Sequence, residues 1–324
     1  MTERLKNTMK KISIILPVYN EAEVIEEFSD VLFSELKKIS DRYSFEVLYC
    51  VDKSSDDTKS IVKAICKGKP GIATYIGFSK RFGHQMALVA GMDHSTGDAA
   101  IMMDCDLEHP PSLIPILLEK FEEGFDVVHT GREYNEKTST IKKGTSSLFY
   151  KLLSSLSSLK LEEGSADFRL VSRKVIDVFK FSIREQHQFL RGLFQWVGFE
   201  QCTVIFSSGI RSGGKSKYTV RRLFSFAVNG IISFSKLPLT ISAIIGFIVA
   251  IFGGIYGIYT IVVFFTDGSV PSGWPSTASL IAFLGGLQLF VLGILGRYIG
   301  EIFDEVKKRP LYIVEEVYSE EIIH

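Results

Sequence analysis

An apolar run gives way to alternating acids in the segment Ile101-Met102-Met103-Asp104-Cys105-Asp106-Leu107-Glu108-His109-Pro110-Pro111. The run begins at Ala99 and predicts a short buried strand, and the two prolines favour the start of a helix. Acids at alternate positions of an extended backbone point the same way, so Asp104, Asp106 and Glu108 are expected to converge on one hard cation and, through it, on a diphosphate. The alternative is a solvated acidic loop that caps the next helix.

Strand and helix patterns alternate on both sides of this segment. Strands are expected over residues 11–18, 45–51, 72–76, 99–103 and 126–130, with helices over about 24–36, 58–67, 85–94 and 113–122. This alternation is typical of a parallel, doubly wound α/β sheet, which binds ligands at the carboxyl ends of its strands. Pro17, Asp52 and Asp104 lie at such ends. The sequence contains no G-x-G-x-x-G fingerprint, which argues against a dinucleotide oxidoreductase.

Two long apolar stretches distinguish the C-terminal third of the chain. No charged residue occurs from 237 to 265, and 278–296 is a second uncharged stretch. Each reaches the roughly 20 residues that a bilayer requires. The link between them lacks Lys and Arg, whereas basic residues flank the pair at Lys236, Arg297, Lys307, Lys308 and Arg309. The positive-inside rule then predicts a hairpin with both ends in the cytoplasm. Two buried core helices are the alternative.

The expected organisation therefore has four parts. They are a cytoplasmic α/β domain over residues 1–218, an amphipathic juxtamembrane helix over 219–236, a transmembrane hairpin over 237–300 with spans at about 237–265 and 278–298, and a cytoplasmic tail over 301–324. The amphipathic helix suits the membrane interface, although it could equally pack on the α/β domain. The 37 basic residues balance 37 acidic ones, so no global charge favours nucleic acid.

Two further segments carry candidate polar side chains. Asp167 lies among small residues just before an apolar strand, where a surface turn is the alternative interpretation. The segment 211–218 is a flexible basic loop that could fold over phosphates, although such charge runs are usually solvated. The four cysteines lack metal-ligand spacing and indicate reduced thiols.

The assembled pattern resembles the family 2 glycosyltransferases and, within them, the polyprenyl-phosphate glycosyltransferases related to dolichyl-phosphate mannose synthase and the bacterial bactoprenol glucosyltransferases. The matching stretches span nearly the whole chain: IILPVYNE at 14–21, VDKSSDDT at 51–58, MDCDLEHPP at 103–111, ADFRLVSR at 166–173, FLRGLF at 189–194, SGGKSKYTVRRL at 212–223 and EVKKRPLYIVEE at 305–316. Each is weak alone, but their order and spacing are specific. The α/β domain would then be a nucleotide-sugar-binding fold of the GT-A type.

The resemblance implies roles for individual residues. The nucleotide-sugar site would comprise Pro17, Tyr19, Asn20, Glu21, Asp52, Asp104, Cys105, Arg132, Arg211 and Lys217. The acceptor phosphate would contact Arg191, Arg211, Lys215 and Tyr218. Asp106, Glu108 and Asp104 would hold Mg²⁺ or Mn²⁺, and Asp106 and Asp167 would be catalytic, with Asp167 a base or a residue that positions the acceptor. Two positions depart from the family pattern: Lys53 replaces the usual second Asp, and Glu108 replaces the usual Gln.

The implied activity is inverting transfer of one sugar from a nucleoside diphosphate sugar, with UDP-glucose as first choice, to undecaprenyl phosphate. The product would serve cell-envelope glycosylation, such as modification of O-antigen or teichoic acid. The resemblance also implies a multi-pass protein of the plasma or inner membrane that assembles as a homo-oligomer, with a tetramer considered. One rival is a processive polysaccharide synthase, which typically carries Q-x-x-R-W where this chain has Gln188-x-x-Arg191-Gly192. A catalytically silent membrane scaffold is the other.

Overall fold

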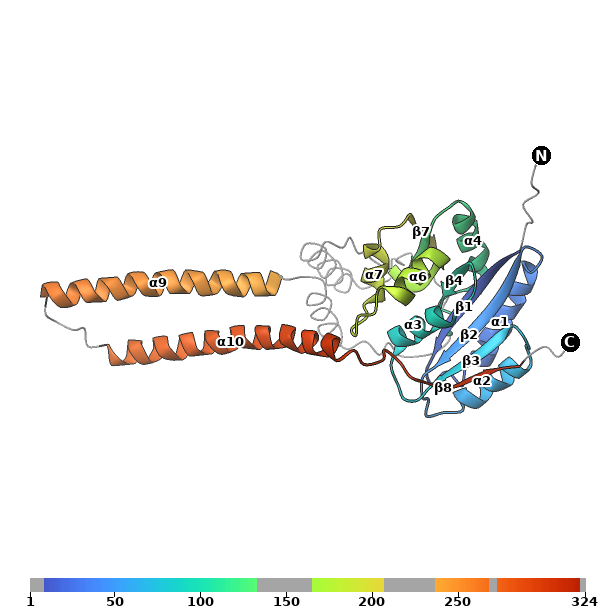
Figure 1. Ribbon diagram of the computed structural model, residues 1–324, viewed down its shortest axis with the longest axis horizontal. Helices are drawn as coiled ribbons and strands as arrows, with labels where there is room; N and C mark the ends of the chain where they lie inside the picture. Colours follow the sequence, from blue (N-terminus) through green and yellow to red (C-terminus); the bar gives the residue numbers. More distant parts are fainter. Residues whose placement is uncertain (1–8, 133–164, 207–236, 268–272, 321–324) are drawn as a thin grey trace, which may run out of the picture. The chain divides into compact units, whose positions relative to one another are not determined.

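The computed structural model describes residues 9–132, 165–206, 237–267 and 273–320. The chain divides into two units, the first containing residues 9–132, 165–206 and 310–320 of the described part, and the second containing 237–267 and 273–309. The first unit is an α/β domain and the second is a pair of long helices (Figure 1). The expected amphipathic helix at 219–236 lies outside the described residues.

The α/β unit is built on one mixed sheet with strand order β7-β5-β6-β4-β1-β2-β3-β8. The strands are β1 Lys10–Val18, β2 Tyr43–Val51, β3 Ala73–Phe78, β4 Ala99–Met102, β5 Val127–Arg132, β6 Ser165–Ser172, β7 Gln201–Phe206 and β8 Val314–Ser319. Strand β1 pairs in parallel with β2 and β4, and β2 pairs in parallel with β3. These four strands are the parallel centre that the sequence predicts.

Helices cover both faces of this centre, which explains why β1 is apolar along most of its length. They are α1 Ile25–Lys38, α2 Thr58–Lys67, α3 His84–His94, the 3₁₀ turn η1 Pro111–Leu113, α4 Ile114–Glu122, α6 Arg173–Phe181 and α7 Leu190–Trp196. Helices α1, α2 and α4 share a buried cluster with Ile12, Ile14 and Leu16 of β1. Helix α3 packs on the opposite face, where a Cβ on Gly91 would lie 2.1 Å from Cγ2 of Ile15. Glycine therefore lets α3 approach the sheet closely.

Two antiparallel strands correct the expectation of a parallel sheet. Strand β6 lies between β4 and β5 and is antiparallel to both, while β8 is antiparallel to β3. Asp167, which the sequence places just before a strand, lies inside β6. The regular strand and helix alternation of the sequence, which predicts parallel pairing, runs from β1 to β5, and β6 lies beyond it in the chain.

The C-terminal tail contributes to the α/β unit rather than forming a separate segment. Strand β8 extends the edge of the sheet with Tyr318 opposite Tyr75, and Glu316 pairs with Lys63 and Lys59 of α2. Just before β8, the hydroxyl of Tyr312 donates a hydrogen bond of 2.7 Å to Oδ2 of Asp93 at the end of α3. The tail is therefore held to the sheet and to α3.

The Tyr312→Phe variant is expected to lower the melting temperature of the purified protein. A hydrogen bond to a charged group contributes about 1.5–3 kcal/mol, and Arg184 remains on Asp93 in the variant, so the low end applies. A domain of this size loses about 2–4 °C per kcal/mol. Thermal unfolding in detergent measures the shift, with Tyr318→Phe, in the strand that follows Tyr312, as the matched control. Equal melting temperatures for Tyr312→Phe and the native protein would show that this contact does not hold the tail.

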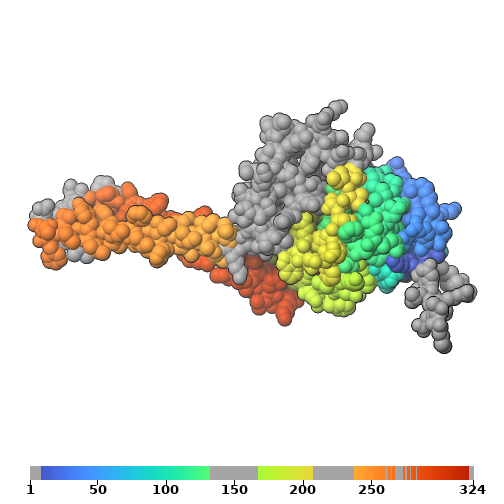
Figure 2. All heavy atoms as spheres, turned by 90° about the horizontal axis from the view of Figure 1, so that it is seen from above, coloured from blue at the N-terminus to red at the C-terminus, as the bar shows by residue number. Residues whose placement is uncertain are grey.

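The second unit consists of α9 Leu237–Asp267 and α10 Trp274–Lys307, which contact each other. The stretches 237–259 and 279–307 are long and apolar enough to cross a membrane. Large apolar side chains on them are exposed, including Phe247 at 68% and Phe252 at 69%. Figure 2 shows the atoms of α9 in orange. Apolar helices with so much exposed apolar surface are typical of segments that face lipid.

Candidate functional site

The loops that follow β1 and β2 meet at one edge of the sheet. Val18 is paired with Val51, so these parallel strands end side by side. Asn20 then joins the two loops: its backbone N–H donates to Oγ of Ser54 at 3.1 Å, and its Oδ1 accepts from the backbone N–H of Ser55 at 2.9 Å. The φ of Asn20 is 54°, a left-handed conformation that asparagine tolerates better than most residues. This edge is where the sequence predicts ligand binding.

Asp52 is buried at the end of β2, with 2% of its surface exposed. Its two carboxylate oxygens accept hydrogen bonds from the backbone N–H groups of Phe82 and Gly83, each at 2.8 Å. Asp52 therefore fixes the loop before α3, a structural task that the sequence did not indicate. Gly83 has a φ of 95°, which an L side chain would adopt only with strain. The predicted contact of Asp52 with base and ribose stays a prediction.

The same loop places Arg81 against Tyr19. The guanidinium carbon of Arg81 lies 3.9 Å from the centroid of the Tyr19 ring, which is a cation–π contact. It brings a positive charge from the loop after β3 to the loop after β1. Tyr19 is a predicted nucleotide-sugar residue, whereas Arg81 was not singled out in the sequence.

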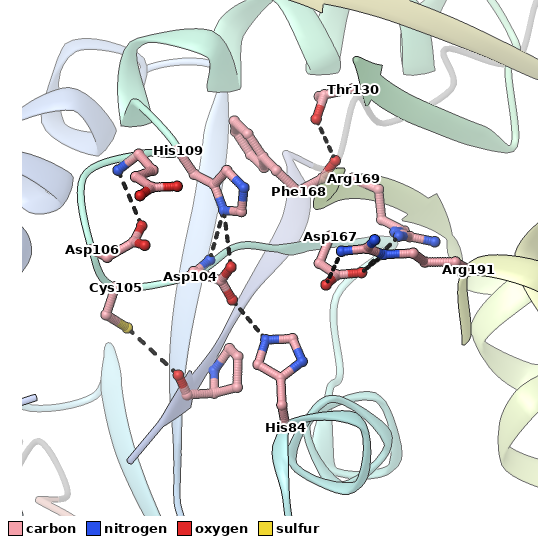
Figure 3. Close-up of polar contacts among 12 residues, drawn as sticks. His84, Asp104, Cys105, Asp106, His109, Thr130, Asp167, Phe168, Arg169 and Arg191 are labelled. Carbon is pink, nitrogen blue, oxygen red and sulfur yellow. Dashed lines mark hydrogen bonds and ion pairs between the residues drawn. The ribbon is translucent and has the colours of Figure 1, made fainter. Parts of the chain in front are cut away.

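Asp104 follows β4 and is held by two histidines (Figure 3). Nε2 of His84, the first residue of α3, lies 2.7 Å from Oδ1 of Asp104. The backbone N–H of Asp104 donates to Nδ1 of the buried His109 at 3.1 Å. Burial raises the pKa of Asp104, but His84 and His109 lower it by more. The net pKa of this carboxyl is therefore below the usual value for aspartate.

The acidic segment is a compact turn rather than an extended strand. Leu107 has a φ of 59°, and Oδ1 of Asp106 accepts the backbone N–H of Glu108 at 3.0 Å. Cys105 points into the protein, where its thiol lies 3.9 Å from the carbonyl oxygen of Pro17. The extended geometry expected for the three acids is therefore wrong, and the described residues contain no group of three side chains arranged to hold a metal ion.

Negative charge is nevertheless concentrated in this turn. Burial raises the pKa of Asp106, and the charges of Asp104 and Glu108 raise it further. Carboxylate oxygens are the ligands that Mg²⁺ and Mn²⁺ prefer, so the chemistry of Asp106 and Glu108 fits such an ion. A cation would relieve the repulsion that raises the pKa of Asp106. The assignment of a metal to these residues stays a prediction.

Asp167 is the centre of an arginine cluster on β6 (Figure 3). Nε and NH2 of Arg191, the second residue of α7, donate to Oδ1 and Oδ2 of Asp167, each at 2.8 Å. NH2 of the buried Arg169 lies 3.3 Å from Oδ1 of the same carboxylate. Burial raises the pKa of Asp167, but Arg191 and Arg169 lower it by more, to well below its usual range. Burial also lowers the pKa of Arg169 to about 10.

The acidic turn and the arginine cluster are neighbours in the sheet. Met102 is paired with Arg169 in the antiparallel ladder between β4 and β6, so Asp104, two residues beyond Met102, lies beside Asp167 in β6. Both carboxylates affect the pKa of His84. Burial lowers this pKa, but the hydrogen bond and charge of Asp104, together with the charge of Asp167, raise it by more. The site thus places two carboxylates beside three cationic or ionisable side chains.

Comparisons with known proteins give the family. The family model described as Glycosyl transferase family 2 matches residues 13–179. An SfII prophage-derived bactoprenol glucosyl transferase of Shigella flexneri is 39% identical over 307 residues, covering 94% of this chain and 97% of that protein. This chain is a family 2 glycosyltransferase. The family expected from the sequence is confirmed.

Two further relatives resemble this glycosyltransferase over nearly its full length, and a solved structure resembles it over about two thirds. A prophage bactoprenol glucosyl transferase homolog of Escherichia coli K12 is 39% identical over 309 residues, covering 95% of this chain and 99% of that one. An uncharacterized glycosyltransferase, YkcC of Bacillus subtilis, is 37% identical over 310 residues, covering 95% and 94%. Among solved structures, glucosyl-3-phosphoglycerate synthase of Mycobacterium tuberculosis with Mn²⁺, UDP and phosphoglyceric acid has a TM-score of 0.46 at 18% identity, covering 69% and 76%.

The predicted site residues of the glycosyltransferase lie in several places. The end of β1 and the loops after β1 and β2 contain Pro17, Tyr19, Asn20, Glu21 and Asp52. The structure brings Asp104, Asp167 and Arg191 together and places Asp106 and Glu108 on the adjoining turn. The side chain of Arg132, at the end of β5, lies outside what the structure describes, as do the residues Arg211, Lys215, Lys217 and Tyr218.

Sequence reasoning missed four polar side chains of this site: Arg81, His84, His109 and Arg169. A signal existed for two of them. His84 follows Gly83 at the start of a helix that succeeds a strand, and Arg169 is two residues from Asp167, on the same face of a strand. The other two are recognisable through their contacts.

Proposed function

We propose that this glycosyltransferase transfers one sugar from a nucleoside diphosphate sugar to a polyprenyl phosphate in the membrane. UDP-glucose is the proposed donor and undecaprenyl phosphate the proposed acceptor. The observation that carries the proposal is the 39% identity to bactoprenol glucosyl transferases over 94% of the chain, which includes both apolar helices as well as the α/β domain. The similarity therefore extends over the apolar helices, which suit a lipid acceptor, as well as over the α/β domain, which suits a soluble donor.

On the donor side, negative charge develops on the diphosphate as the sugar leaves. A divalent cation held by Asp106 and Glu108 would supply electrostatic stabilisation of that charge. The chain's own residues do the remaining work in this proposal. Tyr19 with Arg81 presents an aromatic face and a positive charge to the nucleotide, and Asp104 presents a fixed carboxylate to a sugar hydroxyl.

On the acceptor side, the nucleophile is an oxygen of the lipid phosphate. A phosphate monoester has its second pKa near about 6, so at neutral pH it is largely dianionic and needs little help from a base. Asp167 is bound by both arginines and has a lowered pKa, which makes it a weak base and a good anchor. We assign it the task of orienting Arg191 toward the phosphate. A single displacement would invert the anomeric centre.

The membrane part of the proposal follows from the two apolar helices. Crossing of the bilayer by α9 and α10 would keep the chain beside its lipid acceptor, with the α/β unit on the cytoplasmic side where nucleotide sugars are made. We further propose that copies of the chain associate through these helices. The product would be a lipid-linked monosaccharide for glycosylation of the cell envelope.

The test is a transfer assay with the full-length protein in lipid nanodiscs. The protein is incubated with a panel of nucleotide sugars, Mg²⁺ or Mn²⁺ and undecaprenyl phosphate, and the lipid product is weighed by mass spectrometry. We expect a product with one hexose per lipid phosphate, made from UDP-glucose. A ladder of longer saccharides would instead support a processive synthase, and the lack of any product across the panel would support a silent scaffold.

A further inference from the structure

The first turn of α3 contacts both halves of the site. Nε2 of His84 lies 2.7 Å from Oδ1 of Asp104, on the side of the acidic turn. The neighbouring Gln85 accepts the backbone N–H of Leu190 at 3.1 Å through its Oε1, at the start of the helix that carries Arg191. Neither side chain was assigned a role from the sequence. Of the two, His84 contacts a predicted ligand-binding carboxylate directly.

The direction of the hydrogen bond between His84 and Asp104 follows from chemistry. An ionised carboxylate can only accept, so Nε2 of His84 donates its proton toward Oδ1. Nδ1 of His109 accepts the backbone N–H of Asp104, so this nitrogen is not a donor to the carboxylate, whose Oδ2 lies 3.5 Å from it. His109 therefore fixes the backbone of Asp104, and His84 fixes its side chain.

This arrangement separates Asp104 from the other two acids. Figure 3 shows its carboxylate pointing toward His84, while the carboxylate of Asp106 lies against the turn. Asp104 keeps 31% of its side chain exposed, and each carboxylate oxygen has a second lone pair for another donor. Asp104 is thus oriented to accept a hydroxyl of a ligand rather than to complete a ligand set with Asp106 and Glu108.

The position of Asp104 indicates which hydroxyl it would accept. In the proposed reaction the transferred sugar lies between the diphosphate of the donor and the phosphate of the acceptor. Asp104 lies between the acidic turn and the arginine cluster, because it precedes Asp106 by two residues and continues from β4 beside Asp167 on β6. If the diphosphate binds at the acidic turn and the acceptor phosphate at the arginine cluster, as proposed, a carboxylate at this place would face the transferred sugar.

We infer that His84 is a positioning residue that holds Asp104 in the orientation in which it accepts a hydroxyl of the transferred sugar. The inference rests on the proposed function. It predicts that His84 contributes to binding of a nucleotide sugar and contributes little to binding of the nucleoside diphosphate alone. A side chain that only stabilised the fold would affect both ligands equally.

The experiment measures binding of UDP-glucose and of UDP to the full-length protein by isothermal titration calorimetry with Mg²⁺. His84→Ala is expected to weaken UDP-glucose binding about tenfold, the size expected for a hydrogen bond to a charged group, and to change UDP binding by less than about twofold. His84→Gln, whose amide N–H can reach the same oxygen, is expected to restore most of the lost affinity. Gln85→Ala, on the same turn, should leave the ratio of the two affinities unchanged.

The outcomes separate this inference from the proposed function. Equal weakening of both ligands, or unchanged UDP-glucose binding in His84→Ala, would overturn the role of His84 while the donor assignment stands. Failure of the native protein to bind UDP-glucose would overturn the donor assignment and the inference with it. In steady-state assays the same variant should raise KM for UDP-glucose and leave KM for the lipid unchanged.

Discussion

The Asp106→Asn variant is expected to lose sugar transfer almost completely, by about 1,000-fold or more in kcat, while folding normally. Asp106 lies in the acidic turn, where burial and the charges of Asp104 and Glu108 raise its pKa. Its negative charge therefore costs the folded protein stability at neutral pH, which fits a carboxylate that is retained for function. Electrostatic groups that stabilise a developing charge are worth factors of about 100–1,000 each, and Asp106, as a proposed metal ligand, is expected to be at the upper end of that range or above it.

Two measurements check this result in the purified protein. Transfer is followed with UDP-glucose and undecaprenyl phosphate, and melting temperature is recorded with and without Mn²⁺. The variant should melt at or above the temperature of the native protein, because a raised folded pKa means that ionisation destabilises the fold above that pKa. Added Mn²⁺ should raise the melting temperature of the native protein and not that of the variant. Asp41→Asn, at an exposed position, is the matched control.

Normal turnover in Asp106→Asn would remove Asp106 from the catalytic step. An inactive variant that Mn²⁺ still stabilises would instead place the ion on other residues. Glu108→Gln provides the comparison, since glutamine restores the residue that the family usually has at this position. We expect that variant to retain activity with weaker metal binding.

The Arg191→Ala variant is expected to lose transfer by about 100-fold and to be clearly less stable than the native protein. Arg191 makes two hydrogen bonds of 2.8 Å to Asp167, whose side chain is 14% exposed. Removing one partner of a buried pair costs about 3–5 kcal/mol, and the retained Arg169 places the loss toward the low end. Arg191→Lys keeps the positive charge but lacks the planar guanidinium. Its transfer rate and its stability should lie between those of the native protein and those of Arg191→Ala.

The pH dependence of stability gives an independent readout of this pair. The folded pKa of Asp167 is lowered, so its contribution is present above the unfolded value of about 3.9 and is lost as pH falls toward the folded value. The difference in melting temperature between native protein and Arg191→Ala should therefore be full at pH 7 and narrow below about pH 4. A difference that stays constant with pH would mean that packing, rather than charge, holds Arg191. Native turnover in Arg191→Ala would confine the arginine to a structural task.

The central fold could be predicted because its signals are local. Strands β1, β2 and β4 are short apolar runs that end in turn residues, and helices α1 and α2, which follow β1 and β2, each bury one apolar face. Such patterns specify burial over fewer than ten residues, and parallel order follows from the alternation of strands with helices. The same local patterns predict the two apolar helices.

The features that were missed depend on contacts between distant segments. The pairing of β8 with β3 joins residues more than two hundred positions apart, and the antiparallel insertion of β6 is set by tertiary packing. The geometry of the acidic turn was predicted wrongly for a different reason. Leu107 adopts a left-handed conformation, which breaks the alternation of side chains expected for an extended backbone. The position of His84 at the start of a helix is visible in the sequence, but its partner Asp104, twenty residues further on, is identified by their hydrogen bond.

Strand β8 also determines when the sheet can be finished during synthesis. The strand follows both apolar helices in the chain, so a ribosome releases it after them, when the other seven strands have long been made. Until then the outer edge of β3 presents unpaired backbone groups to any passing strand. A fragment that stops before Leu237 would keep the outer edge of β3 unpaired permanently. Adding residues 310–320 back through a short glycine-rich linker would supply the missing strand.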